Sequence, residues 1–358
     1  MAARPSWGVS LSAVASSREN SLNLVKLLAA LSVIYSHSYA LCLGREAGSL
    51  LSVHTNGLTS PGGIAVGVFF LFGGFYIAKS CESHPGAADF FLIRCKRIFP
   101  QLAVLVFGCV LVLGPLATTL APAEYFSSPE TYRYLLNLAL VPTHGLPGVF
   151  ESTPYGSVIN GALWTLPVEF ACYVLCYLGY RLTRFDKRRV LALSAPCLLV
   201  TVAYFAFFDL AFWSVVRAVL LFYAGVLLWV YRDRVVLDER AGVLACLAFA
   251  ALLLAKFDVV AMLLAFPYAI LWLVYSPAVR RLGRAFDVFE PSYGVYLWGW
   301  PIQQVLVSLW PGAMAPAVNF ALASVLALVA GTLSAGLVEG KWPAFLARAG
   351  GAELERVR

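Results

Sequence analysis

The chain alternates long apolar runs with short polar segments. A helix needs roughly 20 residues to cross about 30 Å of hydrocarbon. Ten runs approach that length, and we expect each to form a membrane-spanning helix, at 22–43, 63–80, 98–120, 160–180, 190–208, 212–230, 241–256, 258–276, 292–310 and 316–338. The seventh and eighth runs are separated only by Lys256 and Asp258, which predicts a tight turn. The pattern therefore predicts an all-α, polytopic helix bundle.

Basic residues divide unevenly between the polar segments. With the N-terminus inside, 22 of the 26 Lys and Arg residues lie on the inner side, three (Arg45, Arg133 and Lys256) lie outside, and Arg217 lies within a span. Membrane proteins carry this excess of Lys and Arg on the cytoplasmic side. We therefore expect both termini in the cytoplasm, with polar extensions at 1–20 and 341–358 around one transmembrane domain at 21–340.

Composition supports the membrane assignment and narrows the function classes. Hydrophobic residues make up 61% of the chain and charged residues 13%, against roughly 45–50% and about 25% in soluble domains. The net charge of +7 sits in short clusters between apolar runs, which argues against nucleic-acid binding. The eight cysteines form neither a disulfide framework nor a metal motif. The first run has no cleavage motif after it and indicates an uncleaved span.

Titratable residues inside a span are costly and are functional hypotheses by default. Lys26 and His37 lie eleven residues apart in the first run, so they share a helix face about 16 Å apart along the axis. His37, near the outer side, has an ordinary pKa suited to taking a proton from a hydroxyl. The alternative is a neutral histidine hydrogen-bonded to another helix.

Glu169 lies in W-T-L-P-V-E-F near the outer end of the fourth run. We expect it at a depth similar to that of His37, where its carboxylate would orient the imidazole. The alternative is a simple interaction with the positive end of its own helix.

Arg94, Lys96 and Arg97 open the third predicted span on the inner side. Arg94 and Arg97 are at i and i+3 and therefore share a helix face. Guanidinium groups bind phosphate oxygens through paired hydrogen bonds, so these two predict a phosphate site that Lys26 could join. Ordinary anchoring at the membrane surface is the alternative.

Other polar and aromatic positions are weaker candidates. We take Trp164, Tyr293, Trp298 and Gln303 as candidates for lining a channel or an acceptor site, with interface anchoring or helix–helix hydrogen bonding as the alternative. Pro301 predicts a kink in the ninth span. The run G-V-F-F-L-F-G-G-F at 67–75 indicates close helix packing, and Arg217 needs a partner, for which Asp209 is near in sequence. The long outer loops 44–62 and 121–159 either hold an acceptor or simply connect helices.

Six segments in order resemble the integral-membrane acyltransferase-3 family, over about 19–345. They are N-S-L-N-L-V-K-L-L-A-A-L-S-V-I-Y-S-H-S, G-V-F-F-L-F-G-G-F, R-C-K-R-I-F-P, N-G-A-L-W-T-L-P-V-E-F-A-C-Y, S-Y-G-V-Y-L-W-G-W-P-I and V-E-G-K-W-P. Many members have Ser where Gly73 stands and His where Gly299 stands. Any role of a second histidine is therefore absent here.

The resemblance implies a bacterial inner-membrane enzyme that O-acylates surface polysaccharide, lipopolysaccharide or glycolipid sugars. It implies His37 as catalytic base, Glu169 as support for His37 or the acceptor, and Arg94, Arg97 and Lys26 as contacts of the phosphates of acyl-coenzyme A. Acetyl-CoA is the favoured co-substrate, and no metal or permanently bound cofactor is expected. The enzyme would act alone or with separate glycan-biosynthesis partners.

A transporter of a small anion or a lipid-linked sugar is the main rival. It explains the number of spans, the Pro-broken helix and the buried polar groups equally well. It does not explain why Lys26, His37, Arg94 and Arg97 occur as matched sets. A membrane sensor or scaffold has no positive feature in the sequence.

Overall fold

The computed structural model describes residues 8–17, 20–45, 48–208, 210–283, 290–310 and 312–339. Its longer helices are α2 (Leu22–Leu43), α4 (Pro61–Ser83), α5 (Ala87–Gly108), α9 (Thr165–Thr183), α10 (Lys187–Phe207), α11 (Trp213–Val230), α12 (Glu239–Leu254), α14 (Phe266–Tyr275), α16 (Ser292–Leu309) and α17 (Pro316–Glu339). Short helices are α1 (Leu11–Val14), α3 (Leu50–His54), α6 (Gly114–Ala117), α7 (Pro122–Ser127), α8 (Pro129–Arg133), α13 (Asp258–Val260) and α15 (Pro277–Gly283). Single π turns at Cys109–Leu113 and Ala261–Ala265 join α5 to α6 and α13 to α14, and 3₁₀ turns lie at Tyr134–Ala139 and Gly161–Trp164.

Eight of the described helical segments are long and apolar enough to cross a membrane. They correspond to eight of the ten predicted runs. The other two runs also form helices, α12 with 16 residues and α16 with 18. The protein is thus an all-α, polytopic chain, while the total of ten spans and the cytoplasmic side of the termini stay predictions. The N-terminal seven residues and the predicted tail at 341–358 lie outside the described residues.

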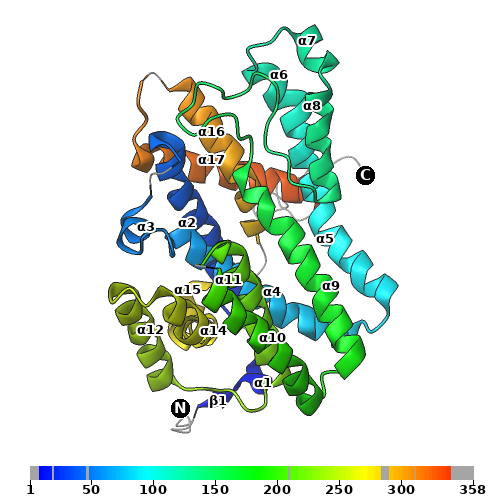
Figure 1. Ribbon diagram of the computed structural model, residues 1–358, viewed down its shortest axis with the longest axis vertical. Coiled ribbons are helices and arrows are strands. Elements are labelled where there is room, and N and C mark those ends of the chain that lie inside the picture. The colour runs from blue at the N-terminus through cyan, green and yellow to red at the C-terminus, as the bar shows by residue number, and fades with distance from the viewer. Residues whose placement is uncertain are drawn as a thin grey trace, which may run out of the picture.

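The connecting segments gather at two opposite ends of the bundle (Figure 1). At one end, which we call the basic end, β1 (Val9–Ser10) pairs with β2 (Val236–Leu237), and the Ser21 amide donates a hydrogen bond to the Val274 carbonyl. At the other, the loop end, Arg45 donates to the Tyr155 carbonyl, and His54 is hydrogen-bonded to that of Leu254. The contacts reproduce the predicted alternation of inner and outer segments.

Glycines let α4 approach its neighbour α11, with which it packs extensively. A Cβ on Gly74 would collide with the Phe222 carbonyl of α11, and one on Gly225 would collide with the Leu71 carbonyl of α4. Only glycine permits such close backbone contact between helices. The packing role predicted for the Gly-rich run is therefore confirmed.

The loop end is held by buried hydrogen bonds from α16. Gln303 donates to the Ile34 carbonyl, the Ser38 hydroxyl and the Asn319 side chain, and so ties α16 to α2 and α17. Gln304 donates to the carbonyls of Gly156 and Val158 in the predicted outer loop. That loop is ordered, and α7 and α8 cover the far end of α5 and α6 (Figure 1).

One boundary prediction needs correction, and a second is confirmed. The third span was expected to begin at 98, but the helix begins at Ala87, so the Arg94–Arg97 cluster lies two turns inside it. The three basic residues Arg94, Lys96 and Arg97 lower the local hydropathy, so the apolar pattern does not show that the helix continues through them. Arg and Lys are nevertheless good helix formers. The turn predicted at Lys256 is confirmed: Lys256 has φ +62° between α12 and α13.

Arg217 is packed within the bundle, where its partners among the described residues include Leu58 and Asp258. Its Nη1 donates to the Leu58 carbonyl, and its nearest acidic influence is Asp258 at the start of α13. Asp209 lies outside the described residues.

Candidate active site

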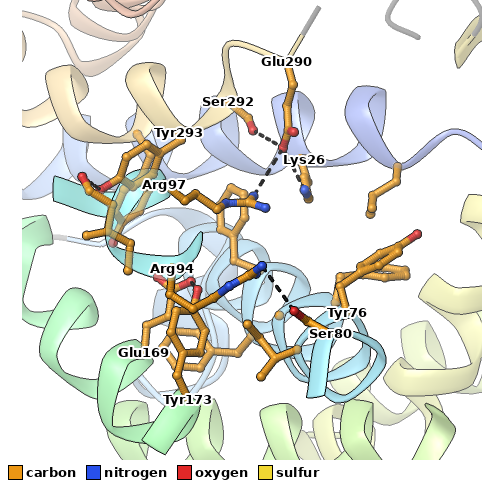
Figure 2. A pocket seen from close by; sticks show the side chains of 18 of the residues that line it. Lys26, Tyr76, Ser80, Arg94, Arg97, Glu169, Tyr173, Glu290, Ser292 and Tyr293 are labelled. Carbon is orange, nitrogen blue, oxygen red and sulfur yellow. Dashed lines mark hydrogen bonds and ion pairs between the residues drawn. The ribbon is translucent and has the colours of Figure 1, made fainter. Parts of the chain in front are cut away.

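A cavity of about 540 Å³ opens between the helices near the basic end (Figure 2). The helices that enclose it are α2, α4, α5, α9 and α16. Its charged lining comprises four Lys and Arg residues against two carboxylates: Lys26, Lys79, Arg94, Arg97, Glu169 and Glu290. An excess of positive charge around a concave, partly apolar space suits a ligand that is itself anionic.

The α5 helix contributes two of the cations. Arg94 and Arg97 both line the cavity, while Lys96 is exposed and does not. This division follows from the i, i+3 spacing, which the sequence predicted. Arg94 donates to the Ser80 hydroxyl of α4 at 3.3 Å and lies over the Phe90 ring. One side of its guanidinium is therefore fixed while it points into the cavity.

Lys26 contributes the third cation and is paired with Glu290, which precedes α16. Lys26 Nζ donates to Glu290 Oε1 at 2.7 Å, and the Arg97 guanidinium lies 4.0 Å from the same oxygen. Burial on its own would raise the pKa of the Glu290 carboxyl. The neighbouring Lys26 and Arg97 charges, with hydrogen bonds from Lys26 and Ser292, instead lower that pKa to about 2. Glu290 is therefore ionised at any physiological pH.

Glu169 lies in this cavity and not beside His37. Its Oε1 accepts a hydrogen bond from the Tyr173 hydroxyl one turn further along α9. Glu169 also interacts electrostatically with Lys26, Arg94 and Arg97. The expected pairing of Glu169 with the imidazole is not formed, because α9 directs the carboxylate toward the basic end.

His37 lies three turns further along α2 than Lys26, as the spacing predicted. Its ring packs edge-on against Trp300 of α16, with centroids 4.6 Å apart, and Trp300 packs in turn against Tyr155. Within the described residues, neither ring nitrogen makes a hydrogen bond. His37 is half-buried and is not among the residues that line the cavity.

Thr165 and Tyr296 close the cavity on the side toward His37. Their hydroxyl groups are hydrogen-bonded at 2.8 Å, and Tyr296 also donates to the Ala162 carbonyl. Tyr296 is the last residue of α16 that lines the cavity, and Trp300, which contacts His37, lies one turn beyond it. Thr165 and Tyr296 thus form a layer at the end of the cavity nearest to Trp300 and His37.

Of the four residues predicted as candidates for lining a channel or an acceptor site, one lines the cavity and three do not. Tyr293 lines the cavity and donates to the Ile98 carbonyl. Trp164, Trp298 and Gln303 do not line it. Gln303 is fully buried in hydrogen bonds between helices, which was the alternative interpretation of that residue.

The two family departures have different surroundings. Gly73 lines the cavity, and a Cβ there would meet the Phe222 ring at an ordinary 3.6 Å. The serine common in the family would therefore fit. Gly299 is buried against α2, where a Cβ would lie 2.9 Å from Ile34. A side chain there would require Ile34 to move.

Glu290 and Tyr173 are two polar residues of the site that the sequence reasoning missed. Glu290 lies just before S-Y-G-V-Y, at the same predicted membrane face as Lys26 and Arg97. The available signal was that this inner segment holds two acids, Asp287 and Glu290, beside its arginines. Tyr173 lies one turn from Glu169 on the same helix face, which would have marked it as a partner.

One protein family and two known proteins match this chain in sequence. The family model of the acyltransferase-3 acyltransferase domain matches residues 19–338. The chain is 27% identical to the O-acetyl transferase of Shigella phage Sf6 over 345 residues, which cover 91% of this chain and 96% of that protein. It is 32% identical over 176 residues to nodulation protein 10 of Rhizobium leguminosarum bv. viciae, covering 44% of this chain and 43% of that protein. No solved structure matches the chain.

The match covers the helices that form the cavity and those around His37, and it favours an enzyme over the transporter that the sequence left open. The chain belongs to the integral-membrane acyltransferase-3 family and is an O-acyltransferase.

Proposed function

We propose that the protein transfers an acyl group, acetyl in the simplest case, from cytoplasmic acyl-CoA to a sugar hydroxyl of a polysaccharide, lipopolysaccharide or glycolipid. The proposal places the enzyme in a bacterial inner membrane with ten spans and both termini in the cytoplasm. The basic end then faces the cytoplasm, where acyl-CoA is made.

One observation carries the donor assignment: Lys26, Arg94 and Arg97 converge on a single cavity from α2 and α5. Acyl-CoA is a polyanion, and its phosphates suit guanidinium and ammonium groups. The apolar part of the lining, including Val66, Phe69 and Leu166, suits the uncharged arm that ends in the thioester. The 27% identity to an O-acetyl transferase supports acetyl as the group transferred.

His37 is the proposed general base. The acceptor hydroxyl oxygen attacks the thioester carbonyl, an ester C–O bond forms, the C–S bond breaks, and the proton passes through His37 to the leaving thiolate. An imidazole without a hydrogen-bonding partner in the described structure suits this role, because a nitrogen is available to the hydroxyl.

The layer between cavity and histidine sets a requirement for this mechanism. The thioester has to reach past the Thr165–Tyr296 hydrogen bond, so these side chains move when the donor is fully seated. Glu169 and Tyr173 lie beside the proposed donor path, and the hydroxyl proton of Tyr173 is hydrogen-bonded to the Glu169 carboxylate. We therefore place Glu169 with the donor and not with the imidazole.

The test compares surface glycans from cells carrying the wild-type protein, His37→Ala or no protein, with membrane levels matched and glycans analysed by mass spectrometry. An acyl-sized mass increment that requires the wild-type protein supports the proposal. An equal increment with His37→Ala would remove His37 from the chemistry. Glycans without any increment in all strains, including strains supplied with the whole biosynthetic locus, would contradict the acceptor class.

A further inference from the structure

Glu290 occupies the centre of the cation set in the cavity. Its Oε1 accepts hydrogen bonds from Lys26 Nζ at 2.7 Å and from the Ser292 hydroxyl at 3.3 Å, and lies 4.0 Å from Arg97 Nη2. Figure 2 shows these three contacts meeting on the one carboxylate. A single anionic oxygen therefore stands where two cationic side chains and a hydroxyl group converge.

The Lys26 side chain needs this partner in an empty cavity. It is only 13% exposed, and an ammonium group removed from water is costly unless a charge and hydrogen bonds compensate it. The Arg97 side chain, by contrast, is 53% exposed and stays beyond hydrogen-bond distance of Glu290. Glu290 thus satisfies Lys26 and leaves the Arg97 fork available.

A phosphate group offers the same chemistry as this carboxylate. It presents anionic oxygens that accept hydrogen bonds from ammonium, guanidinium and hydroxyl groups. Two anions cannot share the position without repulsion, since like charges brought together at a partly desolvated site cost free energy. Glu290 and a bound phosphate group therefore compete for Lys26, while the Arg97 fork stays available to the phosphate.

We propose that Glu290 is a placeholder for a donor phosphate: its carboxylate holds Lys26 while the cavity is empty and is displaced when a phosphate group of the thioester donor binds. This inference rests on the proposed acyl-CoA donor. It makes Glu290 a residue that weakens donor and product binding and so favours release of free CoA after transfer.

The test measures CoA binding to the full-length protein in lipid nanodiscs, using wild type, Glu290→Gln and Glu82→Gln. Glu82 is a matched control: it also pairs with a basic residue, Arg232, at the basic end, but it does not line the cavity. The glutamine keeps the shape and a hydrogen-bond acceptor for Lys26 while removing the charge. Pantetheine, the uncharged part of CoA, is measured with each protein at millimolar concentration.

We expect Glu290→Gln to bind CoA about three- to tenfold more tightly than wild type, the range for one partly screened charge. Pantetheine binding should be the same for both proteins, and Glu82→Gln should bind CoA like wild type. In a transfer assay, the KM for the donor should fall with the affinity, and inhibition by free CoA should become stronger.

Three results would overturn the inference. Glu290→Gln could bind CoA equally or more weakly although its unfolding on heating stays cooperative, which would make Glu290 a support of the cations. Glu290→Gln could bind CoA and pantetheine with the same increase in affinity over wild type, which would indicate that the substitution had widened the cavity. Wild type and Glu82→Gln could both fail to bind CoA, which would reject the donor assignment itself and this inference with it.

Discussion

The two ends of the bundle differ in what they leave available. Near the basic end, four cations surround a cavity of about 540 Å³, and among the described residues Glu290 is the one carboxylate that forms an ion pair with any of them. Near the loop end, His37 is packed against Trp300. The side-chain amide N–H groups of Gln303, Gln304 and Asn160 donate hydrogen bonds to backbone carbonyls there. The basic end therefore holds a cavity that suits a ligand, whereas the loop end packs side chains against a half-buried histidine.

The comparison indicates that donor binding and proton transfer are separable. The layer formed by Thr165 and Tyr296 lies at the end of the cavity nearest to His37. Substitutions at the basic end should therefore change donor affinity, and substitution of His37 should change the rate alone.

Replacing His37 with Ala should reduce acyl transfer at least about 100-fold, the lower end of the effect of a positioned general base. Affinity for CoA should stay within about twofold of wild type, because His37 does not line the cavity. His54→Ala at the same end is the control and should transfer normally. A loss of CoA binding in His37→Ala would contradict the separation.

Replacing either Arg94 or Arg97 with Gln should raise the donor KM about 10- to 100-fold, since one charged hydrogen bond contributes about 1.5–3 kcal/mol. Lys96→Gln is the matched control, because Lys96 is on the same turn but outside the cavity. Kinetics at saturating donor separate KM from kcat. An equal effect of Lys96→Gln would indicate membrane anchoring and not a phosphate site.

Replacing Gln303 with Leu should destabilise the fold by about 1–2 kcal/mol, because Asn319 and Ser38 lose a shared hydrogen-bond donor within the bundle. Thermal unfolding in nanodiscs measures the loss. CoA affinity should not change. A selective loss of CoA affinity without destabilisation would instead place Gln303 in the ligand path, as the sequence allowed.

The Lys26–Glu290 pair should give a small stability effect with a defined pH range. The pKa of Glu290 is lowered in the folded protein to about 2 from an ordinary 4.5. The stability that its ionised form contributes is therefore fully present above about pH 4.5 and is lost as the pH falls toward 2. The difference in unfolding midpoint between wild type and Glu290→Gln should be constant from pH 8 to 5 and shrink below pH 4.5. If the difference in unfolding midpoint changed between pH 8 and 5, its pH dependence would come from a titratable group other than Glu290.

Spacing along a helix was the most reliable part of the sequence analysis. Arg94 and Arg97 share a face, and Lys26 and His37 lie three turns apart, because helix geometry fixes both relations locally. The turn at Lys256 and the glycine-mediated packing of α4 also followed from local pattern. The predicted start of the third span failed because hydropathy treats charged residues as breaks, whereas the helix continues through them.

Relations between helices could not be read from spacing. The depth of Glu169 relative to His37 depends on how α9 and α2 are staggered, and this is decided by packing across the whole bundle. Glu290 lies 264 residues from Lys26 along the chain, so no local pattern marks the pair. The ordered loop end likewise depends on Gln304 and Trp300, which bind it from α16.

The most direct test of the account is a cryo-electron microscopy structure of the wild-type protein in nanodiscs with saturating CoA. We expect phosphate density in the cavity in contact with Arg94 and Arg97, with Glu290 moved away from Lys26 and the sulfur end directed toward Thr165 and Tyr296. CoA bound elsewhere on the protein, or an empty cavity with the Lys26–Glu290 pair intact at saturating CoA, would contradict it.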